Sequence, residues 1–126
     1  MSFTNFLETE ILDHVFANSA YVAPTTVHLG LFTAAPSETG GGTEVAGGSY
    51  ARQAAPFTVT GDTASNNAAI EFPTASASWG TVTHVAIFDA ASVGNMMAYA
   101  TLTASKIIGN GDVMRIPIGD LDITLT

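Results

Sequence analysis

The first sixteen residues repeat their large apolar side chains at the spacing of an α-helix. Three or four positions separate most of these residues, and acidic side chains lie between them: Phe3, Phe6, Leu7, Ile11, Leu12, Val15 and Phe16. The spacing predicts an amphipathic helix over residues 4–16, within an N-terminal segment 1–20, with Ser2 or Thr4 as its N-cap and Asn18 as its end. So wide an apolar face has to be buried. We expect it to pack on this chain's own sheets, and packing on a neighbouring subunit is the alternative.

Beyond Pro24 the apolar positions alternate with a period of two, which is typical of strands. The alternating runs are 27–31, 55–59, 68–72, 82–88, 97–101, 114–118 and 121–125. Turn residues separate them at 61–62, 89–95 and 109–112. The pattern predicts one mainly β domain over residues 1–126: an antiparallel β-sandwich or flattened barrel of seven to eight strands over 25–126, preceded by one helix.

The same alternation predicts which side chains form the core. Each candidate lies in a two-period run between turn signals. The predicted core residues are Val27, Leu29, Leu31, Phe57, Ile70, Phe72, Val85, Ile87, Leu102, Ile116, Ile123 and Leu125.

The charge of the chain restricts its partners. Eleven acidic residues against Arg52, Lys106 and Arg115 give a formal charge of −8. This balance disfavours nucleic acids and anionic membranes, because affinity for both comes largely from cationic side chains. The acidic N-terminus does not resemble a signal peptide, no run is as long as a membrane span, and cysteine is absent. We expect the chain to be made in the cytoplasm and kept there until it is assembled or released.

A glycine-rich loop over residues 36–49 follows the first predicted strand. Its glycines are Gly40, Gly41, Gly42, Gly47 and Gly48. A phosphate-binding loop would precede a helix and a nearby lysine, whereas an extended run follows here and no lysine is near, so nucleotide binding is disfavoured. Long loops without structure of their own are often functional or ordered by a partner. We therefore expect a flexible loop that contacts another chain and becomes ordered on assembly.

The histidines give little support for a metal or catalytic site. Glu10 and His14 are four residues apart on the predicted helix, and one ion could bind both. No third ligand is evident, so we expect a surface pair. His28 and His84 lie in strands, where a half-buried, hydrogen-bonded imidazole is expected.

The carboxylates and hydroxyls are equally unspecific. Asp112, Asp120 and Asp122 would supply too few oxygens for calcium, and on a strand edge their charge would oppose edge-to-edge pairing. No serine stands in a nucleophile motif. We predict no enzymatic activity, no cofactor and no metal.

Trp79, the only tryptophan, enters a strand after a small-residue turn. Burial in the core or at an interface is the expected role of so large a side chain. The alternative is a shallow glycan-binding groove in which Trp79 or Tyr50 stacks on a sugar ring, with a host-surface glycan as the ligand.

Long segments of the sequence resemble a known family. These are TTVHLGLFTAAPSETGGGTEVAGGSYARQ and EFPTASASWGTVTHVAIFDAASVGNMMAYATLTASKIIGNGDVMRIPIGDLDITL, together with the helical opening FLETEILDHVFANSAYVAPTTV. They resemble small virion proteins of tailed bacteriophages, described as tail fibre or minor tail proteins, and the likeness covers nearly the whole chain. The resemblance implies a structural virion component without catalytic residues, whose partners are copies of itself and other tail or capsid subunits.

The leading hypothesis is therefore a non-enzymatic tail fibre or minor tail subunit, and a capsid decoration protein is the rival. Glu38 and Glu44 are the only charges of the loop and are expected to pair with basic residues of a partner, while Val45 and Tyr50 would be apolar anchors. The predicted interface residues are Glu38, Gly40, Gly41, Gly42, Glu44, Val45, Gly47, Gly48, Tyr50, Phe3 and Phe6.

Overall fold

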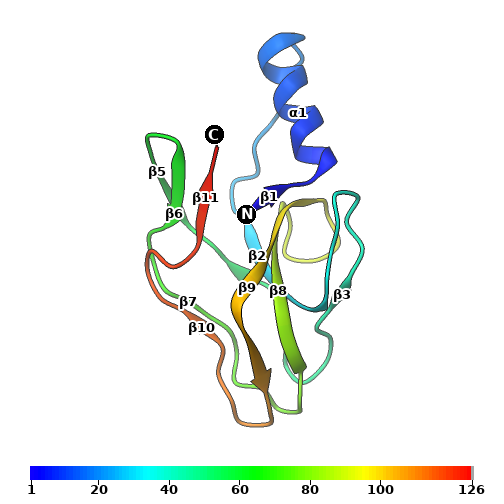
Figure 1. Ribbon diagram of the computed structural model, residues 1–126, viewed down its shortest axis with the longest axis vertical. Coiled ribbons are helices and arrows are strands. Elements are labelled where there is room, and N and C mark those ends of the chain that lie inside the picture. Colours follow the sequence, from blue (N-terminus) through cyan, green and yellow to red (C-terminus); the bar gives the residue numbers. More distant parts are fainter. Residues whose placement is uncertain (126) are drawn as a thin grey trace.

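The computed structural model describes residues 1–125, which form one helix and eleven strands (Figure 1). In chain order they are β1 Ser2–Phe3, α1 Asn5–Phe16, β2 His28–Ala34, β3 Thr43–Glu44, β4 Gln53–Ala54, β5 Phe57–Thr60, β6 Thr63–Asn66, β7 Ile70–Glu71, β8 Gly80–Phe88, β9 Met96–Ile108, β10 Arg115–Ile116 and β11 Asp122–Thr124. Every strand pairing is antiparallel.

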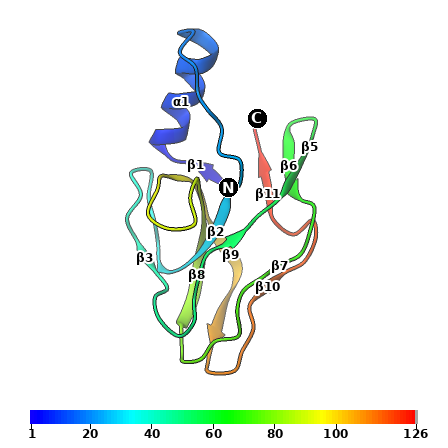
Figure 2. The ribbon, with the colours of Figure 1, turned by 180° about the vertical axis from the view of Figure 1, so that it is seen from behind.

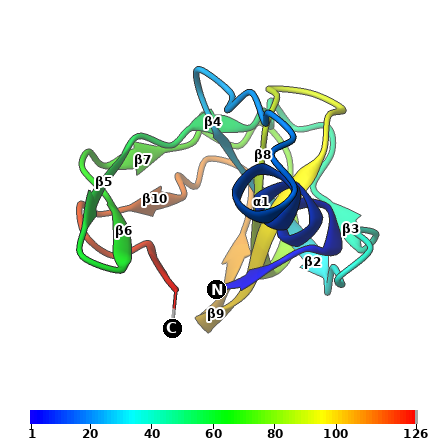
Figure 3. The ribbon, with the colours of Figure 1, turned by 90° about the horizontal axis from the view of Figure 1, so that it is seen from above.

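Three sheets enclose the core. The largest has the order β1-β9-β8-β2-β3, and β4 also pairs with β2. The pair β7-β10 and the three-stranded sheet β5-β6-β11 lie on the other side of the molecule (Figure 3). Sheets that pack across one core confirm the predicted mainly β, antiparallel fold, and no closed barrel forms among the described residues.

The core matches the alternation of the sequence with one exception. Seven predicted residues are buried: Leu29, Leu31, Ile70, Phe72, Val85, Ile87 and Ile116. Val27, Phe57, Leu102 and Ile123 are partly buried against them. The prediction for Leu125 is wrong, because this residue lies past the end of β11 and is 56% exposed.

The strand count exceeds the predicted seven to eight. Several strands are only two residues long, so they are too short to show an alternation. The strand β6, with the sequence TASN, carries no large apolar side chain and pairs between β5 and β11. Strands of this kind are set by their neighbours and not by their own pattern.

Helix α1 projects beyond the sheets (Figures 1 and 2). It ends where predicted, since Asn18 adopts a left-handed conformation with φ 54° and the N–H groups of Ala17 and Ser19 both bond to the carbonyl of Asp13. None of its residues is buried, and only Phe6 and Leu7 of its first two turns pack on the core. The expectation that its whole apolar face packs on this chain is therefore wrong. Among residues 1–125, no helix is long and apolar enough to cross a membrane.

Candidate assembly surface

The glycine-rich loop is folded onto the body of the chain. Ser37 and Gly40 exchange two backbone hydrogen bonds of 2.8 and 2.9 Å, and β3 pairs with the edge of β2. The N–H of Val45 then donates to the carbonyl of Leu31 at 2.9 Å. The loop thus makes hydrogen bonds within its own chain, which the prediction of a flexible segment did not include; its contact with a partner stays a prediction.

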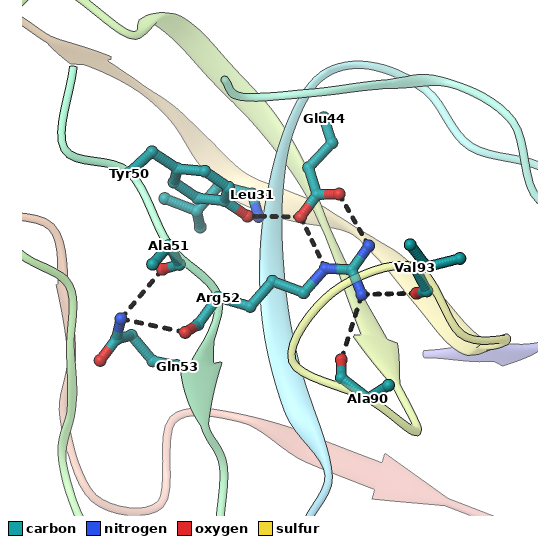
Figure 4. A network of polar contacts seen from close by, with 8 residues as sticks. All are labelled: Leu31, Glu44, Tyr50, Ala51, Arg52, Gln53, Ala90 and Val93. Carbon is teal, nitrogen blue, oxygen red and sulfur yellow. Dashed lines mark hydrogen bonds and ion pairs between the residues drawn. The ribbon is translucent and has the colours of Figure 1, made fainter. Parts of the chain in front are cut away.

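A network of charged and aromatic groups holds the second half of the loop (Figure 4). Arg52 donates from Nε and Nη2 to both carboxylate oxygens of Glu44, each at 2.8 Å. The hydroxyl of Tyr50 donates to Glu44 at 2.7 Å and accepts the N–H of Leu31 at 2.9 Å. Burial and the hydrogen bond to Glu44 raise the pKa of Tyr50. Because Glu44 is paired within the chain, the prediction that it pairs with a partner is wrong.

Arg52 also connects the hairpin loop 89–95 to this network through hydrogen bonds. Its Nη1 donates to the carbonyl oxygens of Ala90 and Val93, at 3.1 and 2.8 Å, and its guanidinium carbon lies 3.4 Å from the ring centre of Phe88. Val93 has φ 55°, which is strained for a β-branched residue. A single basic side chain therefore positions two loops that lie far apart in the sequence.

Gly30 has no side chain, and this leaves room for the network of Glu44 and Tyr50. A Cβ atom at this position would lie 2.8 Å from Oε2 of Glu44 and 3.2 Å from the hydroxyl oxygen of Tyr50. A glycine in the interior of a strand often marks such a close approach. Neither Gly30 nor Arg52 was predicted as part of this site, although a glycine within an alternating run is a sequence signal for such an approach.

Val45 and Trp79 are core residues. They are 6% and 5% exposed. The indole Nε1 of Trp79 donates to the carbonyl of Gly48 at 2.9 Å, and its ring meets Tyr50 edge-on with centroids 5.4 Å apart. This confirms the predicted burial of Trp79. Val45 is therefore not available as an anchor for a partner, and Trp79 offers no open face for a sugar ring.

The loop glycines allow backbone conformations with positive φ. All five have positive φ, from 57° at Gly48 to 91° at Gly40. At Gly48 an added Cβ would also lie 2.8 Å from Nε1 of Trp79 and 3.0 Å from the carbonyl oxygen of Ala77. By contrast, nothing lies within 4 Å of a Cβ at Gly40, Gly41 or Gly47. The tip formed by residues 39–41 is therefore open, while Gly42 and Gly48 are pressed against their neighbours.

The same loop fixes the start of helix α1. The N–H of Asn5 donates to the carbonyl of Glu38 at 2.9 Å, and the hydroxyl of Tyr99 donates to the Glu38 carboxylate at 2.9 Å. Phe3 pairs with Ala98 in the large sheet. These contacts place Glu38 and Phe3, two predicted interface residues, at the base of the helix.

Thr4 completes this base. It occupies the N-cap position, but its hydroxyl donates to the carbonyl of Met96 at 2.6 Å and makes no capping bond, so the predicted role of its side chain is wrong. The residue is 1% exposed, and the carbonyls of β9 are its nearest acceptors. Ser2, the other predicted cap, lies in β1. The helix therefore starts from a rigid position.

The far end of the helix is exposed. Leu12, Val15 and Phe16 are 57%, 61% and 82% exposed. Spaced by three and four residues, they form one apolar stripe, which we call the helix stripe. A rigid base that presents an uncovered apolar stripe is a feature of surfaces that bind another protein.

The histidines form no metal site. His14 accepts the N–H of Tyr21 at 3.2 Å, and no ion pair joins it to Glu10, so that predicted pair is wrong. His84 is hydrogen-bonded to Thr83, as expected, but the buried Nδ1 of His28 has no partner among the described residues. No group of three or more potential metal ligands lies within residues 1–125.

The comparison with known families decides what kind of protein this is. Residues 2–124 match a family model described as podophage GP4 fiber I protein gp80. The chain belongs to this family. It is a structural protein of the phage tail fibre, a component of the virion and not an enzyme. No curated protein matches the sequence significantly.

Membership of the fiber I family agrees with the resemblance found in the sequence and favours the tail fibre over capsid decoration. A fibre protein associates with other tail proteins of the virion.

Proposed function

We propose that this chain is held in the fibre by helix α1, whose outer face packs on another subunit of the tail. The observation that supports the proposal is a twelve-residue helix without a single buried residue, although its stripe carries Leu12, Val15 and Phe16. An isolated helix of this length is marginal in water, and amphipathic helices in proteins gain most of their stability from packing. A subunit that covers the stripe would provide that packing.

The tip of the glycine-rich loop extends this surface. Thr39 and Gly41 are exposed, and Glu38 bonds to the first helical residue, so the tip adjoins the base of the helix. A hollow of about 240 Å³ lies where the tip, the helix start and residues 94–96 meet. We propose that residues 38–41, Phe3 and Phe6 form the rim of the interface, and the helix stripe its centre. Gly47 belongs to the opposite end of the loop and contributes backbone conformation only.

Incorporation of variants into particles tests the proposal. Phe16→Glu should lower the amount of this protein on purified virions at least about tenfold, because a charge would then face the apolar centre of an interface. Val59→Glu is the matched control, since Val59 is 70% exposed on β5 and away from the helix. Equal occupancy of wild type and Phe16→Glu would contradict the proposal.

A further inference from the structure

A groove lies beside the free edge of β9. It has a volume of about 460 Å³ and lies between β9 and β10. Met114, Ile116 and Leu121 are buried residues of its lining, and Leu102 is partly buried. Beyond the short pairing with β1 at Ala98 and Tyr99, this edge of β9 has no strand partner among the described residues.

The groove also holds two cationic side chains. Of the three basic residues, Arg52 is paired with Glu44, whereas Lys106 and Arg115 make no ion pair among the described residues. Both of these exposed cations line the groove, together with one acid, Asp120. An apolar floor with two cations at its margin suits an acidic, amphipathic segment.

Helix α1 is such a segment. It carries Glu8, Glu10 and Asp13 and no lysine or arginine. Glu8 stands four residues before Leu12, so at 3.6 residues per turn it continues the helix stripe by one turn. The face that bears Leu12, Val15 and Phe16 therefore ends in a carboxylate, which complements a groove with an apolar floor and a cationic margin.

We propose that helix α1 of one copy binds in the β9–β10 groove of a second copy. The helix stripe covers Met114, Ile116 and Leu121, and Glu8 pairs with Lys106 or Arg115. This inference rests on the proposed function of the helix and adds the identity of its partner. Charge favours a second copy, because the two cations of the groove and the acidic helix of the same chain are complementary.

A second groove of this chain provides a contrast. It measures about 500 Å³ between residues 24–27 and 54–57 and has no charged side chain in its lining. An acidic helix would leave its carboxylates unpaired there. Thr26, exposed at the margin of this groove, is therefore a control position for added negative charge.

Sedimentation of the purified full chain tests the proposal. Wild type should associate in a concentration-dependent way. Phe16→Glu should weaken association at least about tenfold, and the double variant Lys106→Glu/Arg115→Glu should weaken it roughly two- to tenfold. Thr26→Glu should associate like wild type. Circular dichroism and thermal melting confirm that each variant folds, which is expected because all four positions are exposed.

Two mixtures identify the contact. Phe16→Glu retains the groove and the double variant retains the helix, so the two variants together should associate more tightly than either does alone. A mixture of Glu8→Lys and Lys106→Glu should also associate, because the exchanged charges again form a pair of opposite sign. The expected result is that association recovers in both mixtures. Failure of association to recover in both mixtures would overturn the proposal.

The remaining outcomes separate the two proposals. A monomeric wild type at concentrations of about 100 μM, or a groove variant that associates like wild type, would overturn helix binding in the groove. If Phe16→Glu is nevertheless lost from virions, the helix binds a different tail protein and the proposed function stands. If Phe16→Glu remains on virions at wild-type occupancy, the proposed function itself fails.

Discussion

The glycine-rich loop and helix α1 both looked like contact surfaces in the sequence, but they differ in what their own chain provides. The loop finds partners within the chain for Glu44, Val45 and Tyr50. The helix is fixed only at its base and finds no cover for Leu12, Val15 and Phe16. A segment whose polar and apolar groups are already satisfied has little to gain from a partner, whereas an uncovered apolar stripe has much to gain.

The strongest test of this comparison is to replace one phenylalanine beneath the loop network and one on the helix with alanine. Phe72 is 2% exposed and stacks with Tyr50, with ring centroids 6.2 Å apart. Phe72→Ala should lower the free energy of unfolding by about 3–5 kcal/mol, because it removes a large buried side chain and leaves a cavity below the loop network. Urea unfolding of the isolated chain measures the change.

Hydrogen exchange in the same variant would show which region depends on Phe72. Amides of Val45 and Tyr50, which bond to the backbone of β2 and of the loop, should lose protection, while those of helix α1 should not. Loss of protection in the helix alone would show that the loop network does not pack on Phe72.

Much of the fold could be predicted from the sequence, because the alternating aliphatic residues Leu29 and Leu31 of β2 and Val85 and Ile87 of β8 are buried. The helix stripe likewise has a clear period. The short strands could not, since two residues carry no period. The candidate site was harder still. Glu44 has the same local sequence whether its cation is Arg52 or a residue of another chain, and only the three-dimensional structure brings Arg52 next to it. The exposure of Phe16 depends likewise on what the rest of the chain leaves uncovered.

Alkaline pH tests how much the hydroxyl of Tyr50 in the loop network contributes to stability. Burial and the hydrogen bond to Glu44 raise the pKa of Tyr50 above its ordinary value of 10.0. A raised pKa means that the protonated hydroxyl stabilises the fold fully below pH 10, and that this contribution is lost as the pH rises further. Tyr50→Phe should therefore lower the free energy of unfolding by about 1–2 kcal/mol at pH 8.

The difference between wild type and Tyr50→Phe should then shrink above pH 10, by up to about 1.4 kcal/mol per pH unit. Tyr21 and Tyr99 titrate in both proteins, so their contributions cancel in this comparison. Urea unfolding at pH 8, 9.5 and 11 measures the trend. A difference that stays constant up to pH 11 would show that the hydroxyl of Tyr50 is not buried against Glu44.

The smallest expected effect belongs to the helix. Phe16 is 82% exposed, so Phe16→Ala in the isolated chain should change the free energy of unfolding by no more than about 0.5 kcal/mol. Alanine also has the higher helix propensity, which opposes any loss. The measurement belongs at low protein concentration, where association does not contribute, and Phe72→Ala serves as the buried counterpart of the same substitution. A loss above about 1 kcal/mol would show that the helix packs on its own chain, and the contrast with the loop would then disappear, because both segments would be satisfied before any partner arrives.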